Sequence, residues 1–267
     1  MNDSGAAAKN VSLTDPAATW TGAPGGPAFY AYSTNYLVDL HAGIIVDVEP
    51  SAVNKVAELK VTREMMQRVE DNFKLKPTRF VGDMNHGSAA MLAWLVEHKQ
   101  IEPHVPVWDK SQRTDGTFST GDFIWDGQAN EYRCPAGKSL RAFRRPFKVA
   151  RTGITKEDTI KYRASQFDCV PCPLKPQCCP NTPRRNVARS IHESSRDRAR
   201  EIARTDRYRQ SRKDRKKVEI LFAHLKRILK LDKLRLRGFS GAHDEFLLAA
   251  TAQNLRRMAK WLTPIAA

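Results

Sequence analysis

The chain has 267 residues, of which 41% are hydrophobic and 28% charged, a balance typical of a soluble globular protein. It contains no run of the roughly 18 apolar residues that a transmembrane helix needs. Its first residues lack the basic segment and apolar core of a secretory signal. These features argue against a membrane-spanning or secreted protein, and we expect a cytoplasmic one, associated with the nucleoid if it binds DNA.

The net charge of +16 is concentrated in one segment. Between Arg184 and Arg237 there are 20 Lys or Arg residues and 7 Asp or Glu residues, whereas residues 1–183 carry 22 against 20. A localised basic stripe indicates a polyanionic partner. A membrane surface is the alternative, but the stripe lacks the exposed Trp and Phe anchors of an interfacial helix. The charge pattern therefore favours nucleic acid.

The first half of the chain reads as alternating strands and helices. After an irregular, Ala- and Gly-rich segment at residues 1–27, strands are predicted at 29–40 and 44–51, joined by a turn into an antiparallel hairpin. The next predicted elements are a helix at 55–75, a short strand at 77–83, a helix at 88–99 and a buried strand at 101–107. In the first helix, the spacing lets four apolar residues share a face: Leu59, Met66, Val69 and Phe73.

Asp83 stands at the carboxyl end of the predicted strand 77–83, where ligands collect in open α/β sheets. It could instead cap the following helix, although Ser88 is nearer and a better cap. His86 in the same turn is either a ligand or a turn residue. The pattern leaves these alternatives open.

All five cysteines lie within residues 109–185, a turn-rich segment with a predicted hairpin around Asp126 and Gly127. Four of them have spacings that can close a tetrahedral, structural zinc site: Cys134, Cys169, Cys172 and Cys178. Cys179 is the spare. Disulfides are disfavoured in a cytosolic chain, while an iron–sulfur cluster and free structural thiols remain alternatives.

From about Ile191 the chain is helical and basic. On a helical wheel, residues 212–230 place Arg215, Glu219 and Lys226 together at the edge of an apolar stripe. Glu219 is either half of a surface ion pair or a metal-binding carboxylate on a helix that also holds DNA. A last amphipathic helix, residues 241–262, groups five residues near one side: Phe246, Leu247, Ala250, Asn254 and Leu255.

Several motifs occur in the order found in the DDE transposases of bacterial insertion sequences, which this chain resembles from about Ser12 to Trp261. They are "LTDPAA", "YSTNYLVD", "GDMNHGS", "CPAGKSL", "CVPCPLKPQC", "RKKVEILFAHLK" and "LRLRGFSGAHDEFLLAATAQNLRRM". The resemblance is to a subgroup with a Cys-rich insertion between the second and third catalytic acids. It implies a ribonuclease H-like fold in which three carboxylates bind two divalent metals, Mg²⁺ or Mn²⁺, for DNA cleavage and strand transfer. The implied partners are transposon ends and target DNA, bound by a homo-oligomer.

By this resemblance Asp83 is the second acid and Glu219 the third, with Arg215 and Lys226 at the expected spacing around Glu219. Where the family has a Tyr this chain has Arg212, with Tyr208 one turn earlier. The basic residues expected to hold phosphates without reading bases are Arg212, Arg215, Lys216, Lys217 and Lys226. The chain also departs from the family's Gly-Tyr at Asn85-His86 and from its His-Asn at Gln253-Asn254.

The first acid is expected on a strand upstream of "LTDPAA", where Asp3 is a poor candidate, and Asp39 and Asp47 belong to the following hairpin. We therefore expect a copy truncated at its N-terminus and inactive unless the acid is supplied elsewhere. The alternative is a DNA-binding protein or transposase remnant with a structural zinc module.

The predicted fold is α/β, a ribonuclease H-like core lacking its first strand, with a zinc-ribbon-like insertion and a helical C-terminus. The predicted division is an irregular segment at 1–27, the first part of the core at 28–108, the Cys-rich insertion at 109–185 and the basic helical part at 186–267.

Overall fold

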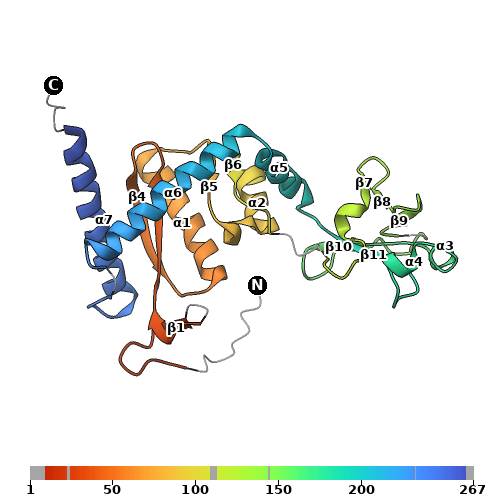
Figure 1. Cartoon of the computed structure of the whole chain (residues 1–267), viewed down its shortest axis with the longest axis horizontal. Coiled ribbons are helices and arrows are strands. Elements are labelled where there is room, and N and C mark those ends of the chain that lie inside the picture. The colour runs from red at the N-terminus through yellow and green to blue at the C-terminus, as the bar shows by residue number, and fades with distance from the viewer. Residues whose placement is uncertain (1–9, 23–24, 109–112, 144, 232, 263–267) are drawn as a thin grey trace. The chain divides into compact units, whose positions relative to one another are not determined.

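The structure, a computed structural model, describes residues 10–22, 25–108, 113–143, 145–231 and 233–262 (Figure 1). Asp3 lies outside these residues. The chain divides into two compact units, one formed by residues 1–85 and 204–267 and the other by residues 86–203. No helix in the described ranges is long and apolar enough to cross a membrane.

The first unit contains two antiparallel hairpins. Strands β3 (Ser33–Asp39) and β4 (Ile44–Ser51) form the predicted one, with a register irregularity between Leu37 and Val38. The second hairpin joins β1 (Thr19–Gly22) to β2 (Ala28–Ala31). The expectation that residues 1–27 are irregular is therefore wrong at β1, whose Trp20 packs on Tyr30 with ring centroids 4.8 Å apart.

Helix α1 (Lys55–Phe73) confirms the predicted helix. The Asn54 side chain caps its start by accepting a 2.8 Å hydrogen bond from the Ala57 amide. Its buried face includes Met66 and Val69 as predicted, but Phe73 is 57% exposed. The chain leaves the helix at the left-handed residue Lys74, so the described residues leave the last turn open to solvent.

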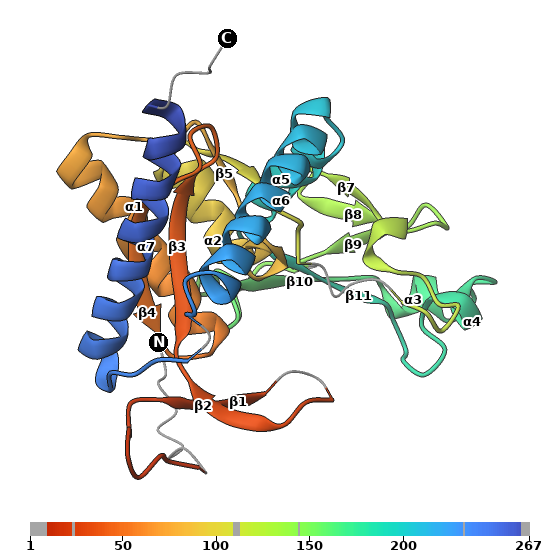
Figure 2. The same cartoon turned by 60° about the vertical axis from the view of Figure 1, so that its left-hand side comes forward.

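Strand β5 (Arg79–Val81) and two long helices, α6 (Asp206–Arg227) and α7 (Gly238–Leu262), complete the first unit. Figure 2 shows α7 running alongside the β3–β4 hairpin. The Asn254 amide receives a 2.9 Å bond from the Ile45 nitrogen and donates a 2.8 Å bond to the Ile45 oxygen. The core between helices and hairpin is formed by Ile45, Val48, Leu221, Leu225, Ala242, Phe246, Ala249 and Ala250.

The predicted face of the last helix is only partly right. Phe246 and Ala250 are buried and Asn254 binds β4, but Leu247 is 47% and Leu255 61% exposed. The helix has apolar residues on more than one side, so spacing alone could not identify the side that packs.

The second unit combines a helical part with an antiparallel sheet. The helical part contains α2 (Ala89–Ala93), continued by a π-helical turn (Trp94–His98), then β6 (Glu102–His104) and α5 (Glu193–Ala203). The Ser88 side chain makes no capping bond to α2, contrary to the prediction. Around residue 86 the chain forms a short 3₁₀ turn (Met84–Gly87).

The sheet of the second unit has the strand order β11-β10-β9-β8-β7 and encloses an aromatic core. The predicted hairpin around Asp126 and Gly127 is confirmed as its β7–β8 ladder. Tyr132 and Tyr162 are almost completely buried and pack edge to face. The elements are β7 (Ile124–Asp126), β8 (Glu131–Arg133), β9 (Ser139–Arg141), β10 (Thr159–Arg163) and β11 (Asn186–Ser190), with short helices at Thr120–Asp122, α3 (Gln166–Cys169) and α4 (Lys175–Cys178). The whole is a mixed α/β fold.

Candidate catalytic and nucleic-acid-binding site

Helix α6 carries Glu219 and most of the predicted DNA-binding residues. At about 100° per residue, one sector of its surface contains Glu219 and four cations, Arg212, Arg215, Lys216 and Lys226. The opposite sector is anchored in the core by Leu221 and Leu225. We call the five-residue sector the α6 basic face. Lys217 points elsewhere and donates a 3.1 Å bond to Asp214.

Buried polar contacts fix the first half of α6. The Thr205 side chain accepts from the Tyr208 amide and begins the helix. Further along, the buried Ser211 and Asp214 side chains accept bonds of 3.0 and 3.1 Å from the Arg79 guanidinium on β5. This contact holds the strand that precedes Asp83 against the helix that carries Glu219.

Replacing Asp214 by Asn is expected to destabilise the first unit by about 2 kcal/mol, because Arg79 loses the charge of a carboxylate that is only 7% exposed. Burial alone would raise the pKa of Asp214, but bonds from Lys217 and Gln210 and the charge of Arg79 outweigh it and hold the pKa below its ordinary value of 3.8.

The folded-state pKa of Asp214 is the lower one, so its stabilisation is complete above the unfolded-state pKa and is lost as pH falls through the folded-state value. Urea unfolding should therefore show a difference between wild type and variant at pH 7 that shrinks below about pH 4. Asp206→Asn is the control, since Asp206 is 88% exposed and binds Arg209 at the surface. Equal losses in both variants would contradict the prediction.

Glu219 is more exposed than a residue at the edge of the core. Its side chain is 62% exposed, and its Oε1 lies 3.4 Å from the Arg215 guanidinium, an i, i+4 ion pair. A pair of this kind contributes only a few tenths of a kcal/mol in water. The geometry is that of an acid held at the surface among cations, available to a ligand.

Asp83 lies two residues beyond β5 and is partly buried. Its Oδ1 accepts a 2.9 Å bond from the Asn85 amide, so the carboxylate shapes the turn that follows the strand. The Asn85 side chain in turn donates a 3.3 Å bond to Glu58 in the first turn of α1. Glu58, which the sequence did not single out, is thus linked to the Asp83 turn through one amide.

The other acids considered for the first position have local roles. Asp39 accepts bonds from the His41 and Ala42 amides in the β3–β4 turn, and Asp47 pairs with Arg68 of α1 at 2.9 Å. Across the described ranges, no group of three or more His, Cys, Asp or Glu side chains is arranged to hold a metal ion. The roles assigned to Asp83 and Glu219 therefore stay predictions.

The five cysteines of the second unit line one pocket together with Lys138, Lys175 and Arg185. All five are free thiols. Burial, followed by the neighbouring Cys179, raises the pKa of Cys178 to about 11, and burial raises that of Cys169. Cys179 adjoins both of these thiols, so it is as well placed as the four predicted ligands. The donor set suits zinc, but in the described part of the chain the thiols are not in a metal-binding arrangement.

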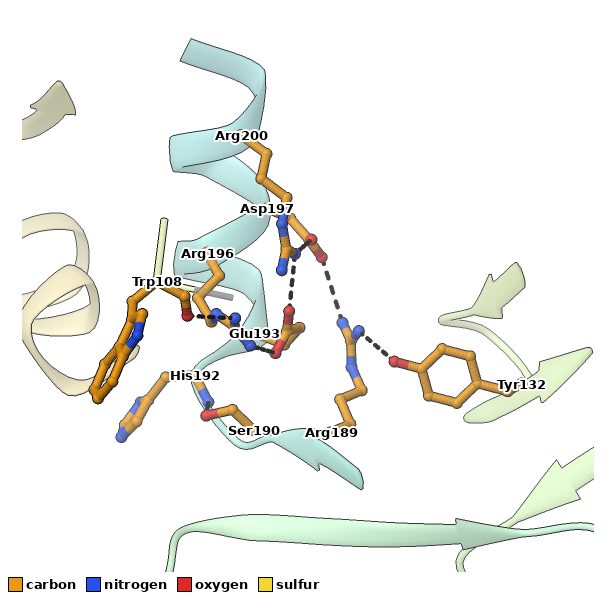
Figure 3. Close-up of polar contacts among 9 residues, drawn as sticks. All are labelled: Trp108, Tyr132, Arg189, Ser190, His192, Glu193, Arg196, Asp197 and Arg200. Atoms are coloured by element: carbon orange, nitrogen blue, oxygen red, sulfur yellow. Dashed lines mark hydrogen bonds and ion pairs between the residues drawn. The ribbon is translucent and has the colours of Figure 1, made fainter. Parts of the chain in front are cut away.

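A charged network that the sequence did not predict connects α5 with the sheet of the second unit (Figure 3). Glu193 is 7% exposed and accepts 2.8 Å bonds from Arg196 and Arg200. Arg200 also binds Asp197 at 2.6 Å, and Asp197 lies 3.5 Å from Arg189 of β11. Arg189 in turn donates to the Tyr132 hydroxyl of β8, while Arg196 donates to the Trp108 carbonyl. The network is structural, because its charges are paired and largely buried.

Comparison with known families adds one finding. Residues 133–259, just under half of the chain, match a family model described as a transposase DDE domain. The matched segment contains the sheet of the second unit from Arg133 onward, α5, all of α6 with Glu219, and most of α7. No curated protein and no solved structure gives a significant match. The family match supports a DDE transposase, and the mixed α/β fold is compatible with the ribonuclease H-like architecture that such an enzyme requires.

Proposed function

We propose that the chain acts in DNA transposition as a DDE transposase, cleaving and joining DNA at the ends of an insertion sequence. The observation that carries this proposal is the family match over α6, the helix on which Glu219 stands among four cations. The α6 basic face holds the phosphates of transposon ends or target DNA, and Asp83 and Glu219 supply carboxylate oxygens for divalent metal.

Asp83 and Glu219 provide only part of a two-metal site, which needs several carboxylates to hold ions about 4 Å apart. The missing acid would come on an added strand. In the part of the chain that the structure describes, β3 pairs with β4 alone, which leaves its other edge without a strand. An edge of this kind accepts an extended segment through backbone hydrogen bonds. The strand could belong to the same polypeptide or to another one.

The proposal is tested with duplexes that carry the DNA on either side of the coding sequence, incubated with the chain and magnesium. Cleavage at defined ends supports the transposase. DNA binding without cleavage favours the alternative, a non-catalytic DNA-binding remnant. An in-frame or frameshifted Asp-Gly-Thr segment just upstream of the coding sequence would locate the missing acid.

Replacing Arg212 and Lys216 by Ala is expected to weaken DNA binding about equally for all sequences. The slope of log K against log salt should fall by about 0.9 for each phosphate that the protein no longer neutralises. Both side chains are exposed on the α6 basic face. Fluorescence anisotropy between about 50 and 200 mM salt measures the slope. Lys60→Ala on α1, where the lysine is 76% exposed, should leave it unchanged, and a comparable change there would mean that binding is not localised on α6.

We also propose that zinc binds the cysteine pocket and stabilises the sheet around it. The purified chain should then contain about one zinc, and removing the metal by chelation should loosen the sheet, as seen by faster amide exchange in β8 and β10. Cys172→Ser should lose the metal, and comparing Cys178→Ser with Cys179→Ser identifies the ligand between these adjacent thiols. A folded chain purified without metal would refute the site.

A further inference from the structure

The outer side of α7 carries a stripe of exposed apolar side chains. Leu248 is 69% exposed, Leu255 61%, Met258 49% and Leu262 78%. Together with the exposed Thr251 they form what we call the α7 seam. Apolar residues scattered singly on a surface are ordinary, but a continuous row along one helix marks a contact surface.

The seam has the spacing of a two-helix contact. Its positions, 248, 251, 255, 258 and 262, alternate steps of three and four residues, the pattern of core positions in a coiled coil. At 100° per residue they fall within about 80° of the helix surface. The residues that pack against the hairpin, Phe246 and Ala249, lie on the opposite side. The seam is therefore a second apolar face, separate from the one that stabilises the first unit.

Charge along the helix favours one orientation. The same three–four pattern, continued backward, reaches the exposed Asp244. In a parallel pair the two Asp244 carboxylates would face each other, at a cost in stability. In an antiparallel pair centred on the seam, Asp244 faces position 262 of the other helix, Leu248 faces Met258, and Thr251 faces Leu255. The acidic first half of each helix, with Asp244 and Glu245, then runs beside the basic second half of the other, with Arg256, Arg257 and Lys260.

We propose that the α7 seam is a dimerisation surface that binds the α7 seam of a second copy of this chain in antiparallel orientation. The interaction does not need DNA, because it is apolar and self-complementary. It is also independent of the cysteine pocket and of any metal.

Sedimentation of the full chain without DNA tests the proposal. The unaltered chain should be a dimer at micromolar concentration, and Leu255→Gln should weaken the dimer by about tenfold or more, since two buried leucines are lost for each pair. The control is Val56→Gln, which alters a 79% exposed residue on α1 and should change nothing. Circular dichroism confirms that both variants keep their helices. A monomeric wild type, or equal behaviour of both variants, would overturn the proposal.

A charge exchange tests the orientation. Thr251→Lys alone and Leu255→Glu alone should each weaken the dimer. In the double variant an antiparallel pair places the introduced lysine of each chain opposite the introduced glutamate of the other, so association should recover. A parallel pair would instead place like charges together. A double variant weaker than either single variant would overturn the antiparallel arrangement.

Discussion

Replacing Glu219 by Gln is expected to lower magnesium-dependent DNA cleavage by about a thousandfold, without weakening DNA binding. A carboxylate that holds a catalytic metal contributes several kcal/mol to the transition state alone, and about 4 kcal/mol corresponds to this factor. Removing a negative charge from the α6 basic face cannot reduce its attraction for phosphates. Single-turnover cleavage and anisotropy, measured on the same DNA, separate the two effects.

Glu201 provides a matched control for Glu219. Its side chain is 65% exposed and forms an ion pair with Arg198 at 3.4 Å, against 62% and 3.4 Å for Glu219 and Arg215. The two glutamates therefore contribute similar, small amounts to stability. Glu201→Gln should cleave DNA like the wild type. If Glu219→Gln did so too, Glu219 would be no more than the surface partner of Arg215.

Replacing Glu193 by Ala is expected to destabilise the second unit by about 3 kcal/mol. The substitution leaves the Arg196 guanidinium, which is only 15% exposed, without its carboxylate, and removes one of two acids from Arg200. Breaking a buried pair by removing one partner costs about this amount, because the remaining charge stays desolvated. Urea unfolding followed by tryptophan fluorescence, which reports on Trp108 and Trp125, measures the destabilisation.

Asp197→Ala is the control from the same network. Asp197 also binds Arg200, at 2.6 Å, but is 47% exposed. Its removal should cost less than about 1 kcal/mol, since water takes the place of the carboxylate beside Arg200. The difference between the two variants measures burial rather than the number of bonds. A cost for Asp197→Ala as large as that for Glu193→Ala would show that the network acts as one cooperative unit.

Local patterns identified the elements well because their periodicities are strong. The hairpin of β3 and β4, helix α1 and the β7–β8 ladder occupy their predicted places. The prediction was wrong where burial depends on what packs against an element. Leu255 shares the periodicity of a core residue, but α7 has two apolar faces, and only the one with Phe246 meets the hairpin.

The site was harder to predict than the fold for a related reason. The spacing of Arg212, Lys216, Glu219 and Lys226 correctly places them on one helical face. Glu193 could not be found in this way, because a glutamate with arginines three and seven residues later is common on exposed helices. Its burial arises from the packing of α5 and its arginines against Trp108 and the sheet, which lie far away in the sequence.

The pair of hydrogen bonds between Asn254 and Ile45 determines in which direction the hairpin sheet can grow. The Asn254 amide satisfies both backbone groups of Ile45 on the side of β4 that faces away from β3, as a neighbouring strand would. This side is therefore closed to further strands, whereas the edge of β3 is open among the residues that the structure describes. Two copies joined edge to edge through β3 would terminate each other. A sheet with one closed side can accept one partner strand but cannot polymerise into a fibre.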